Sequence, residues 1–301
     1  MNASSALERA PDSLLAGHVA YLKREDRHQT GVFKWRATLV VLAAYRDRGH
    51  TTVVTASTGN HGAATAWAAQ EAGLRAVVFV PRGASHRKLE LLGGFGAELR
   101  QVGADLDEAK DEAVRFAGAE GLPFFEDGGD PIQYDAYEAI GVEIVEQLGS
   151  APGSVVVPVG NGALLIGVGR AIRRLAPEAR LVGAVAAGAP VMALSWEAGR
   201  PVDCDSSDTF ADGLAVRVAI PRAVEEIGRI GVEMITVTEE EIARAVGAYA
   251  EAGVHAEGAA GAALAAAQRI DALTDPVVLV VTGRNIDPKL HARAVEQPES
   301  F

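Results

Sequence analysis

The chain has 301 residues, of which 49% are hydrophobic and 23% charged, so it is long enough to bury the core of one large or two medium-sized domains. Its 28 Lys and Arg against 40 Asp and Glu give a formal charge of −12, which argues against nucleic acid or an anionic membrane as a partner. The single cysteine, Cys204, excludes an intrachain disulfide and a cysteine-based metal cluster and fits a reducing cytoplasm. Neither a secretion signal nor a membrane-spanning stretch is expected.

The predicted elements alternate between short β-rich runs and alanine-rich helical windows. A first helix begins near Ala37. The first half of the chain then predicts strands at 53–55 and 76–81 and helices at 63–72, 85–92 and 136–148. The alternation restarts with strands at 155–158, 181–185 and 277–282 and helices at 164–175, 239–252 and 258–270. This order is typical of βαβ units around a parallel sheet, in which ligands bind at the carboxyl ends of the strands.

Two α/β domains are predicted from this order. One boundary is expected near Lys34 and another at the turn cluster Asp127-Gly128-Gly129-Asp130-Pro131. Because the helices are alanine-rich and suited to close packing, the chemistry is expected in the loops at the strand ends.

Lys34 lies between a glycine turn and the first apolar helix, directly before Trp35. A desolvated lysine amine loses its proton readily and can then attack a carbonyl, so Lys34 is a candidate Schiff-base lysine. The alternative is a lysine that opens the helix with its head in water. The local sequence alone favours this alternative, so the case for a Schiff-base lysine depends on the other segments.

The first strand-end loop, Ser57-Thr58-Gly59-Asn60-His61, follows a predicted strand and opens a helix. Hydroxyl and amide side chains, together with the N–H groups of a helix start, suit an anion such as a carboxylate. Helix capping by Ser57 or Thr58 is the alternative explanation.

A second loop, Gly160-Asn161-Gly162-Ala163-Leu164, leads from a buried strand into a helix. Glycines there allow the backbone to approach a phosphate, and the helix N-terminus supplies donors and a positive dipole end. The loop matches neither G-x-G-x-x-G nor a P-loop, so nucleotide binding is not supported. A tight turn without a ligand is the alternative.

A third loop, Thr282-Gly283-Arg284-Asn285, ends the last predicted strand. The Thr282 hydroxyl can donate or accept a hydrogen bond and suits a neutral ring nitrogen better than a carboxylate would. Three such loops and a candidate lysine together favour a cofactor that carries both a phosphate and an aldehyde, namely pyridoxal 5′-phosphate.

These segments, in this order, resemble the fold-type II pyridoxal-phosphate enzymes of the tryptophan synthase β family, and within it the serine/threonine dehydratase and serine racemase branch. The stretches that carry the resemblance span almost the whole chain: 21–26, 30–36, 57–62, 160–164, 210–216, 257–261 and 282–287. The resemblance implies two open twisted-sheet α/β domains with the active site in the cleft between them. It assigns 1–36 and 135–301 to a large cofactor-binding domain and 37–134 to a small mobile domain.

The resemblance also implies a role for each motif residue. Lys34 would carry the cofactor, Phe33 would pack on its ring, and Asn60 would bond its 3-oxygen. The phosphate would be held by Gly160, Asn161, Gly162, Ala163 and Leu164, the ring nitrogen would face Thr282, and Glu257 would lie close to the ring. The substrate carboxylate would be held by Ser57, Thr58, Gly59 and His61. A divalent or monovalent cation is implied near Asp208, Asp212 and the Ala215 carbonyl, where a solvated polar loop is the alternative.

Three positions depart from the family pattern. Val32 stands where the family usually has serine, Asn161 and Ala163 interrupt an all-glycine phosphate loop, and Arg284 replaces a common glycine. The phosphate contacts are therefore expected to differ in detail. Arg284 is either a substrate contact or an exposed charge.

The expected activity is β-elimination on a small hydroxy amino acid such as serine or threonine, giving a 2-oxo acid and ammonia. Racemisation is the first alternative, but the racemase branch has serine at the position of Thr58. β-Replacement is the second, but those relatives usually have threonine at the position of His61. A non-catalytic amino-acid sensor is a third, which the retention of Lys34 disfavours. A cytoplasmic homodimer or homotetramer is expected.

Overall fold

The computed structural model describes residues 4–301 and divides the chain into two compact units. Unit 1 is the chain up to Phe33 together with Tyr137–Phe301, and unit 2 is Lys34–Ala136. The family resemblance implies boundaries at 36/37 and 134/135, whereas the units divide at 33/34 and 136/137. Residues 34–36 and 135–136 thus belong to unit 2 and not to the unit that contains most of the chain. Residues 1–3, which the expected large domain includes, lie outside the described residues.

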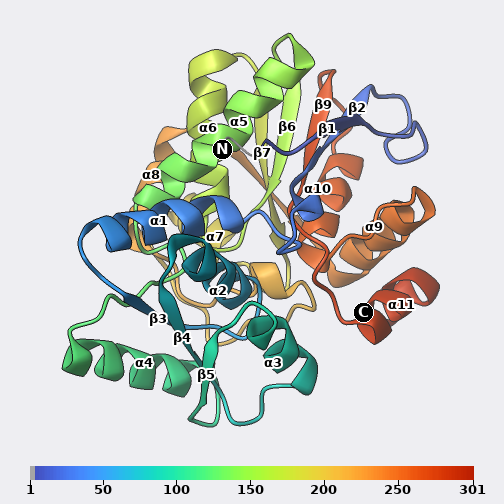
Figure 1. Ribbon diagram of the computed structural model, residues 1–301. Coiled ribbons are helices and arrows are strands. Elements are labelled where there is room, and N and C mark those ends of the chain that lie inside the picture. The colour runs from blue at the N-terminus through green and yellow to red at the C-terminus, as the bar shows by residue number, and fades with distance from the viewer. Residues whose placement is uncertain (1–3) are drawn as a thin grey trace. The chain divides into compact units, whose positions relative to one another are not determined.

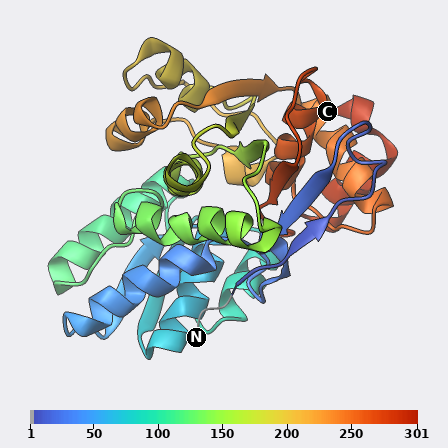
Figure 2. The same cartoon turned by 90° about the horizontal axis from the view of Figure 1, so that it is seen from above.

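Unit 1 is built on a six-stranded sheet of order β1-β2-β9-β6-β7-β8. Its strands are β1 (Leu7–Arg9), β2 (Ala20–Arg24), β6 (Ser154–Pro158), β7 (Arg180–Ala186), β8 (Glu233–Val237) and β9 (Val277–Val281). All neighbours pair in parallel except β1, which runs antiparallel to β2 at one edge. In Figure 2 the dark-blue first strands and the red C-terminal elements lie on the same side of unit 1, as the pairing of β2 with β9 requires.

The helices of unit 1 cover both faces of this sheet. They are α6 (Ala163–Leu175), α7 (Val191–Ala198), α8 (Pro221–Arg229), α9 (Glu239–Glu251), α10 (Gly258–Gln268) and α11 (Pro288–Glu296), with α5 (Ile132–Leu148) crossing the boundary between the units. Figure 1 shows α9 and α10 on one side of β6 and β7, and α6 and α8 on the other. The short 3-10 helices are η1 (Glu25–Arg27), η2 (Asp212–Leu214) and η3 (Pro298–Ser300).

Helix α10 explains how the sheet is covered so closely. Every residue from Gly258 to Ala267 is buried, and all but Leu264 are glycine or alanine. Small side chains let α9 and the strands approach the helix backbone, and a helix that is apolar all round must be buried. A capping box at Thr238 and Glu241 begins α9, with both reciprocal hydrogen bonds formed.

Unit 2 is built on a three-stranded parallel sheet of order β3-β4-β5. Its elements are β3 (Thr52–Ala56), β4 (Arg75–Val80), β5 (Glu98–Gln101), α1 (Trp35–Asp47), α2 (Asn60–Ala72), α3 (His86–Gly93) and α4 (Leu106–Glu120). Side chains of α1, α2 and α3 pack on one face of the sheet and alanines of α4 on the other. The outer side of β3 forms a bridge between Val54 and Phe124, and β5 carries Glu98 and Arg100, which pair at 2.8 Å.

Every strand and helix predicted from the sequence is present, with ends that differ by a few residues. The prediction of α/β architecture with parallel sheets is therefore confirmed. Strands β1, β2, β5 and β8 and helices α4, α7, α8 and α11 were not predicted.

Candidate active site

Lys34 caps the N-terminal end of α1 and is 8% exposed. Its Nζ donates a hydrogen bond of 2.6 Å to Oδ2 of Asp127, and its main-chain oxygen accepts one from the Thr38 hydroxyl at 3.0 Å. The ammonium is therefore held by a carboxylate in a largely buried position. The alternative of a helix-opening lysine with its head in water does not describe this geometry.

The loop that opens α2 presents its backbone donors in an ordered turn. The Ser57 hydroxyl accepts a hydrogen bond from the Gly59 N–H at 3.2 Å, and Gly59 is the N-cap without a side-chain cap of its own. A Cβ at Gly62 would lie 2.9 Å from the Ser57 carbonyl oxygen, so this approach requires glycine. The N–H groups at a helix start suit a carboxylate, and the role expected for this loop stays a prediction.

The His61 side chain points into unit 2 and is 5% exposed. Its Nε2 lies 3.1 Å from the Thr55 hydroxyl and 3.2 Å from the Phe125 carbonyl oxygen, and its Nδ1 lies 3.7 Å from Asp127 Oδ1. Burial lowers the pKa of His61, and the Asp127 carboxylate opposes this shift. Any contact of His61 with a substrate carboxylate would thus involve its main-chain N–H.

In unit 1, the loop from Gly160 to Leu164 joins β6 to α6. A Cβ at Gly160 would lie 2.6 Å from the Gly213 carbonyl oxygen, and Gly162 has φ +92°, a conformation that favours glycine. The Asn161 side-chain oxygen accepts a hydrogen bond from the Ala163 N–H at 3.1 Å. Asparagine therefore occupies one of the donors that an all-glycine loop would leave for a ligand.

Three residues of unit 1 that are distant in sequence meet at the end of β9. The Phe33 N–H donates to the Thr282 carbonyl oxygen at 2.9 Å, and the Phe33 ring lies 5.0 Å from the ring of Tyr137. The Thr282 hydroxyl donates to Glu257 Oε1 at 3.1 Å, and both residues are buried. A Cβ at Gly283 would lie 2.7 Å from the same carboxylate oxygen, so glycine is required beside Glu257.

Arg284 is half-buried and therefore not a purely exposed charge. Its guanidinium donates to the main-chain oxygen of Asp26, and its own N–H donates to the Gly31 carbonyl oxygen at 2.9 Å. Arg284 therefore ties the β9 turn to the segment that precedes Phe33, a role that was not predicted.

The expected cation site lies in the loop that contains η2. The Asp208 N–H donates to the Gly188 carbonyl oxygen at 2.7 Å, Asp212 begins η2, and Ala215 follows it. Within residues 4–301 no group of three or more His, Cys, Asp or Glu side chains is arranged to hold a metal ion. The expected site has only two carboxylates and a carbonyl, so it stays a prediction.

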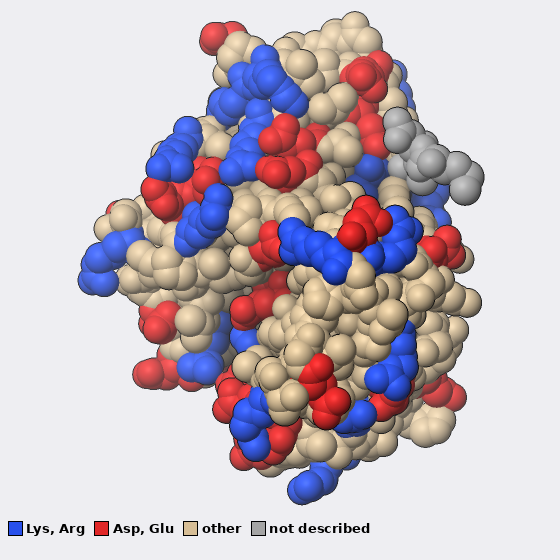
Figure 3. Space-filling view, turned by 60° about the vertical axis from the view of Figure 1, so that its left-hand side comes forward, with Lys and Arg blue, Asp and Glu red and all other residues tan. Residues whose placement is uncertain are grey.

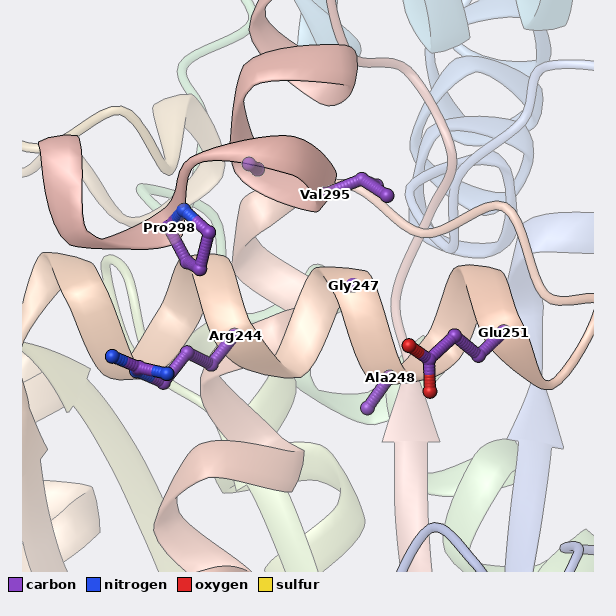
Figure 4. Close-up of a pocket in the computed structure, with 7 residues that line it drawn as sticks. Arg244, Gly247, Ala248, Glu251, Val295 and Pro298 are labelled. Carbon is purple, nitrogen blue, oxygen red and sulfur yellow. The ribbon is translucent and has the colours of Figure 1, made fainter.

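A surface hollow of about 260 Å³ lies between α9 and α11 in unit 1. Figure 4 shows Arg244, Gly247, Ala248 and Glu251 along α9, facing Val295 and Pro298. None of the residues that line it belongs to the predicted motifs. Arg244 also pairs with Glu240 on its own helix. This hollow is therefore not the candidate active site.

Positive and negative side chains are mixed on the surface. On the face drawn in Figure 3, Lys and Arg are interspersed with Asp and Glu and form no continuous basic surface. None of the helices in the described part of the chain combines the length and apolarity that crossing a membrane requires.

The residues fit pyridoxal 5′-phosphate in their donor chemistry. A helix N-terminus behind a close-packed glycine turn suits a phosphate. The buried Thr282 hydroxyl donates to Glu257 here, and it suits a ring nitrogen if it turns its proton away from that carboxylate. A buried amine suits an aldehyde carbon. Fold and site thus define a class of α/β enzymes that use a lysine amine and a phosphate-bearing aldehyde cofactor.

Comparison with known proteins agrees with this class. The model of the family described as pyridoxal-phosphate dependent enzyme matches residues 5–283, and the chain belongs to that family. The chain is 35% identical to an L-threonine ammonia-lyase from Thermotoga maritima, over 95% of this chain and 72% of that protein. It is 33% identical to an L-threonine ammonia-lyase from Geobacter sulfurreducens, over 92% and 70%.

The fold is shared with solved structures. The processed form of threonine deaminase isoform 2 from Solanum lycopersicum superposes with a TM-score of 0.91 at 28% identity, covering 99% of this chain and 88% of that one. The resemblance to the fold-type II family, inferred from the motifs, is therefore confirmed, as is the cofactor that the family uses.

Proposed function

We propose that this protein is a β-eliminating lyase that converts threonine, serine or a similar small hydroxy amino acid into a 2-oxo acid and ammonia. The observation that carries the proposal is the buried Lys34 amine in a chain whose similar proteins are named L-threonine ammonia-lyases. Thr58 and His61 favour elimination over racemisation and β-replacement, since the corresponding branches usually carry other residues there.

The groups of both units are proposed to serve one cofactor molecule. Lys34 follows Phe33 in the chain, and the Phe33 N–H donates to the Thr282 carbonyl oxygen. Bound pyridoxal 5′-phosphate would stabilise the negative charge left at the substrate α-carbon. The phosphate would be held by N–H groups of the turn from Gly160 to Leu164 other than that of Ala163, which donates to Asn161. Asn60 would bond the 3-oxygen.

The remaining chemistry belongs to the protein. The N–H groups at the start of α2 would hold the substrate carboxylate and fix the orientation of the α-carbon. Lys34 Nζ would take the α-proton of the bound substrate as general base. The β-hydroxyl then leaves as water, and hydrolysis of the unsaturated amine gives the 2-oxo acid and ammonia.

An amino-acid panel tests this function. The holoenzyme is incubated with L-threonine, L-serine, their D-isomers and 2,3-diaminopropionate, and the 2-oxo acid, ammonia and chirality are measured. Lys34→Ala should abolish both product formation and the absorbance band of the lysine-linked cofactor, while Lys289→Ala, an exposed lysine in α11, should change neither. Retention of the band in Lys34→Ala, or solvent deuterium in recovered substrate with inversion and no ammonia, would refute the proposal.

The setting of the enzyme is part of the proposal. We expect the protein in the cytoplasm, where the half-buried free thiol of Cys204 would stay reduced. We also expect a homo-oligomer, because members of this family are commonly dimers or tetramers. Sedimentation equilibrium of the purified protein tests the oligomeric state.

A further inference from the structure

Asp127 is a carboxylate of the site that the sequence motifs do not include. One of its oxygens accepts the hydrogen bond from Lys34 Nζ at 2.6 Å, across 93 residues of sequence. The Lys34 side chain is 11% exposed and that of Asp127 35% exposed. An ion pair in which one partner is mostly excluded from water is screened less than a pair on the surface.

The segment around Asp127 is held on both sides. Before it, the Phe125 N–H donates to the Val54 carbonyl oxygen in β3 at 2.8 Å. After it, Gly128 turns the chain with φ +77°, and its N–H donates to the Gln133 side-chain oxygen at 3.0 Å. The Tyr134 hydroxyl donates to the Gly128 carbonyl oxygen at 3.0 Å. The carboxylate therefore reaches Lys34 from a fixed backbone.

His61 does not replace Lys34 as the cationic partner of Asp127. The Phe125 carbonyl oxygen, 3.2 Å from Nε2, can only accept, which favours a proton on Nε2 of the neutral ring. Nδ1 lies 3.7 Å from the Asp127 carboxylate, farther than Lys34 Nζ at 2.6 Å. The adjacent carboxylate, Glu126, pairs with Lys110. The Lys34 ammonium is thus a cation that the Asp127 carboxylate holds directly.

We propose that Asp127 is a positioning residue that holds Lys34 Nζ in place whenever the amine is not covalently engaged. In the apoprotein it would slow attachment of the cofactor, because the amine must leave the carboxylate before it can bond to the aldehyde carbon, whose oxygen leaves as water. During turnover it would stabilise the proton that Lys34 has taken from the substrate. This second role rests on the proposed function, whereas the first does not.

The test uses the apoprotein, without cofactor or substrate. Acetic anhydride acetylates neutral amines, and mass spectrometry of the peptides gives the rate at Lys34 relative to Lys289. Asp127→Asn keeps nearly the same shape but removes the charge, and it should raise the relative acetylation rate at Lys34 about three- to tenfold. A fully buried charge would have a larger effect, but the Asp127 side chain is partly exposed to water. The same variant should bind pyridoxal 5′-phosphate faster at neutral pH, measured by absorbance.

Two further variants separate charge from shape. Asp127→Glu retains the charge and should return the labelling rate to within about twofold of the wild type, and Glu126→Gln, the same charge change one residue away, should leave it unaltered. An unchanged rate in Asp127→Asn, or an equal rise in Glu126→Gln, would overturn the proposal. If Asp127→Asn does not fold, Asp127→Ser serves the same comparison. Failure of the amino-acid panel would leave these labelling ratios untouched, so the two proposals fail separately.

Discussion

Gly283→Ala gives the sharpest test of the arrangement at the end of β9. The new Cβ would lie 2.7, 2.8 and 2.9 Å from the three carboxylate atoms of Glu257. Ordinary contact begins at 3.4 Å, so the carboxylate must withdraw by 3.4 − 2.7 = 0.7 Å. Glu257 is 5% exposed and accepts the Thr282 hydrogen bond, so it cannot simply rotate into water. Gly283 has no positive φ, so the whole effect is steric.

We expect Gly283→Ala to lower the free energy of unfolding of the apoprotein by about 1–3 kcal/mol, the usual range for overpacking a buried site. The measurement is urea denaturation followed by far-UV circular dichroism. The matched control is Gly228→Ala in α8, where a Cβ would meet nothing within 4 Å, and which should be neutral or slightly stabilising.

A double-mutant cycle identifies the cause. In a Glu257→Ala background the clash partner is absent, so adding Gly283→Ala should lower the free energy of unfolding by less than about 0.5 kcal/mol. If the substitution is equally destabilising in both backgrounds, the Glu257 carboxylate is not what Gly283 accommodates, and the reasoning is wrong.

Three further predictions concern single residues. Burial lowers the pKa of His61 below its ordinary 6.5, so the unfolded chain takes up the proton first as the pH falls. The free energy of unfolding should therefore decrease below about pH 6.5, by up to about 1.4 kcal/mol per pH unit. Part of this slope should be absent in His61→Gln, measured between pH 5 and 7. Asn161→Ala removes the hydrogen bond to the Ala163 N–H and should lower stability by about 1 kcal/mol, measured by urea denaturation. Glu143→Ala removes the carboxylate that lies 2.6 Å from the fully buried Lys23 ammonium. The free energy of unfolding should fall by about 3–5 kcal/mol in the same assay, and a loss below about 1 kcal/mol would contradict this.

The parts of the fold that the sequence predicted are those with continuous apolar runs. Strands β6 and β9 are buried along their whole length, and their valine-rich sequences predict central parallel strands. Three of the unpredicted strands, β1, β5 and β8, lie at sheet edges and are mostly half-buried, so their sequences are mixed. Strand β2 could not be recognised because it contains the charged residues Lys23 and Arg24. Both are buried beside carboxylates, and the sequence does not show these pairings.

The same distinction applies to the site. Lys34, Gly160 and Thr282 could be recognised because each motif is contiguous. Asp127 could not be recognised, because its role depends on a contact with Lys34, which is distant in the sequence. The residues that follow Asp127, two glycines and then Asp130-Pro131, indicate only a turn. The hydrogen bond from Thr282 to Glu257 joins two motifs that were each predicted, but their contact follows from the pairing of β9 in the sheet.

The edges of the small sheet in unit 2 have a consequence for how the protein survives before the cofactor is attached. An unprotected edge strand can recruit a strand from another chain and begin aggregation. The outer side of β3 is engaged by Phe124, and β5, at the other edge, presents Glu98 and Arg100. A foreign strand would have to bury this ion pair in order to add to β5. The apoprotein, before pyridoxal 5′-phosphate is attached, therefore has little tendency to associate through the edges of this sheet.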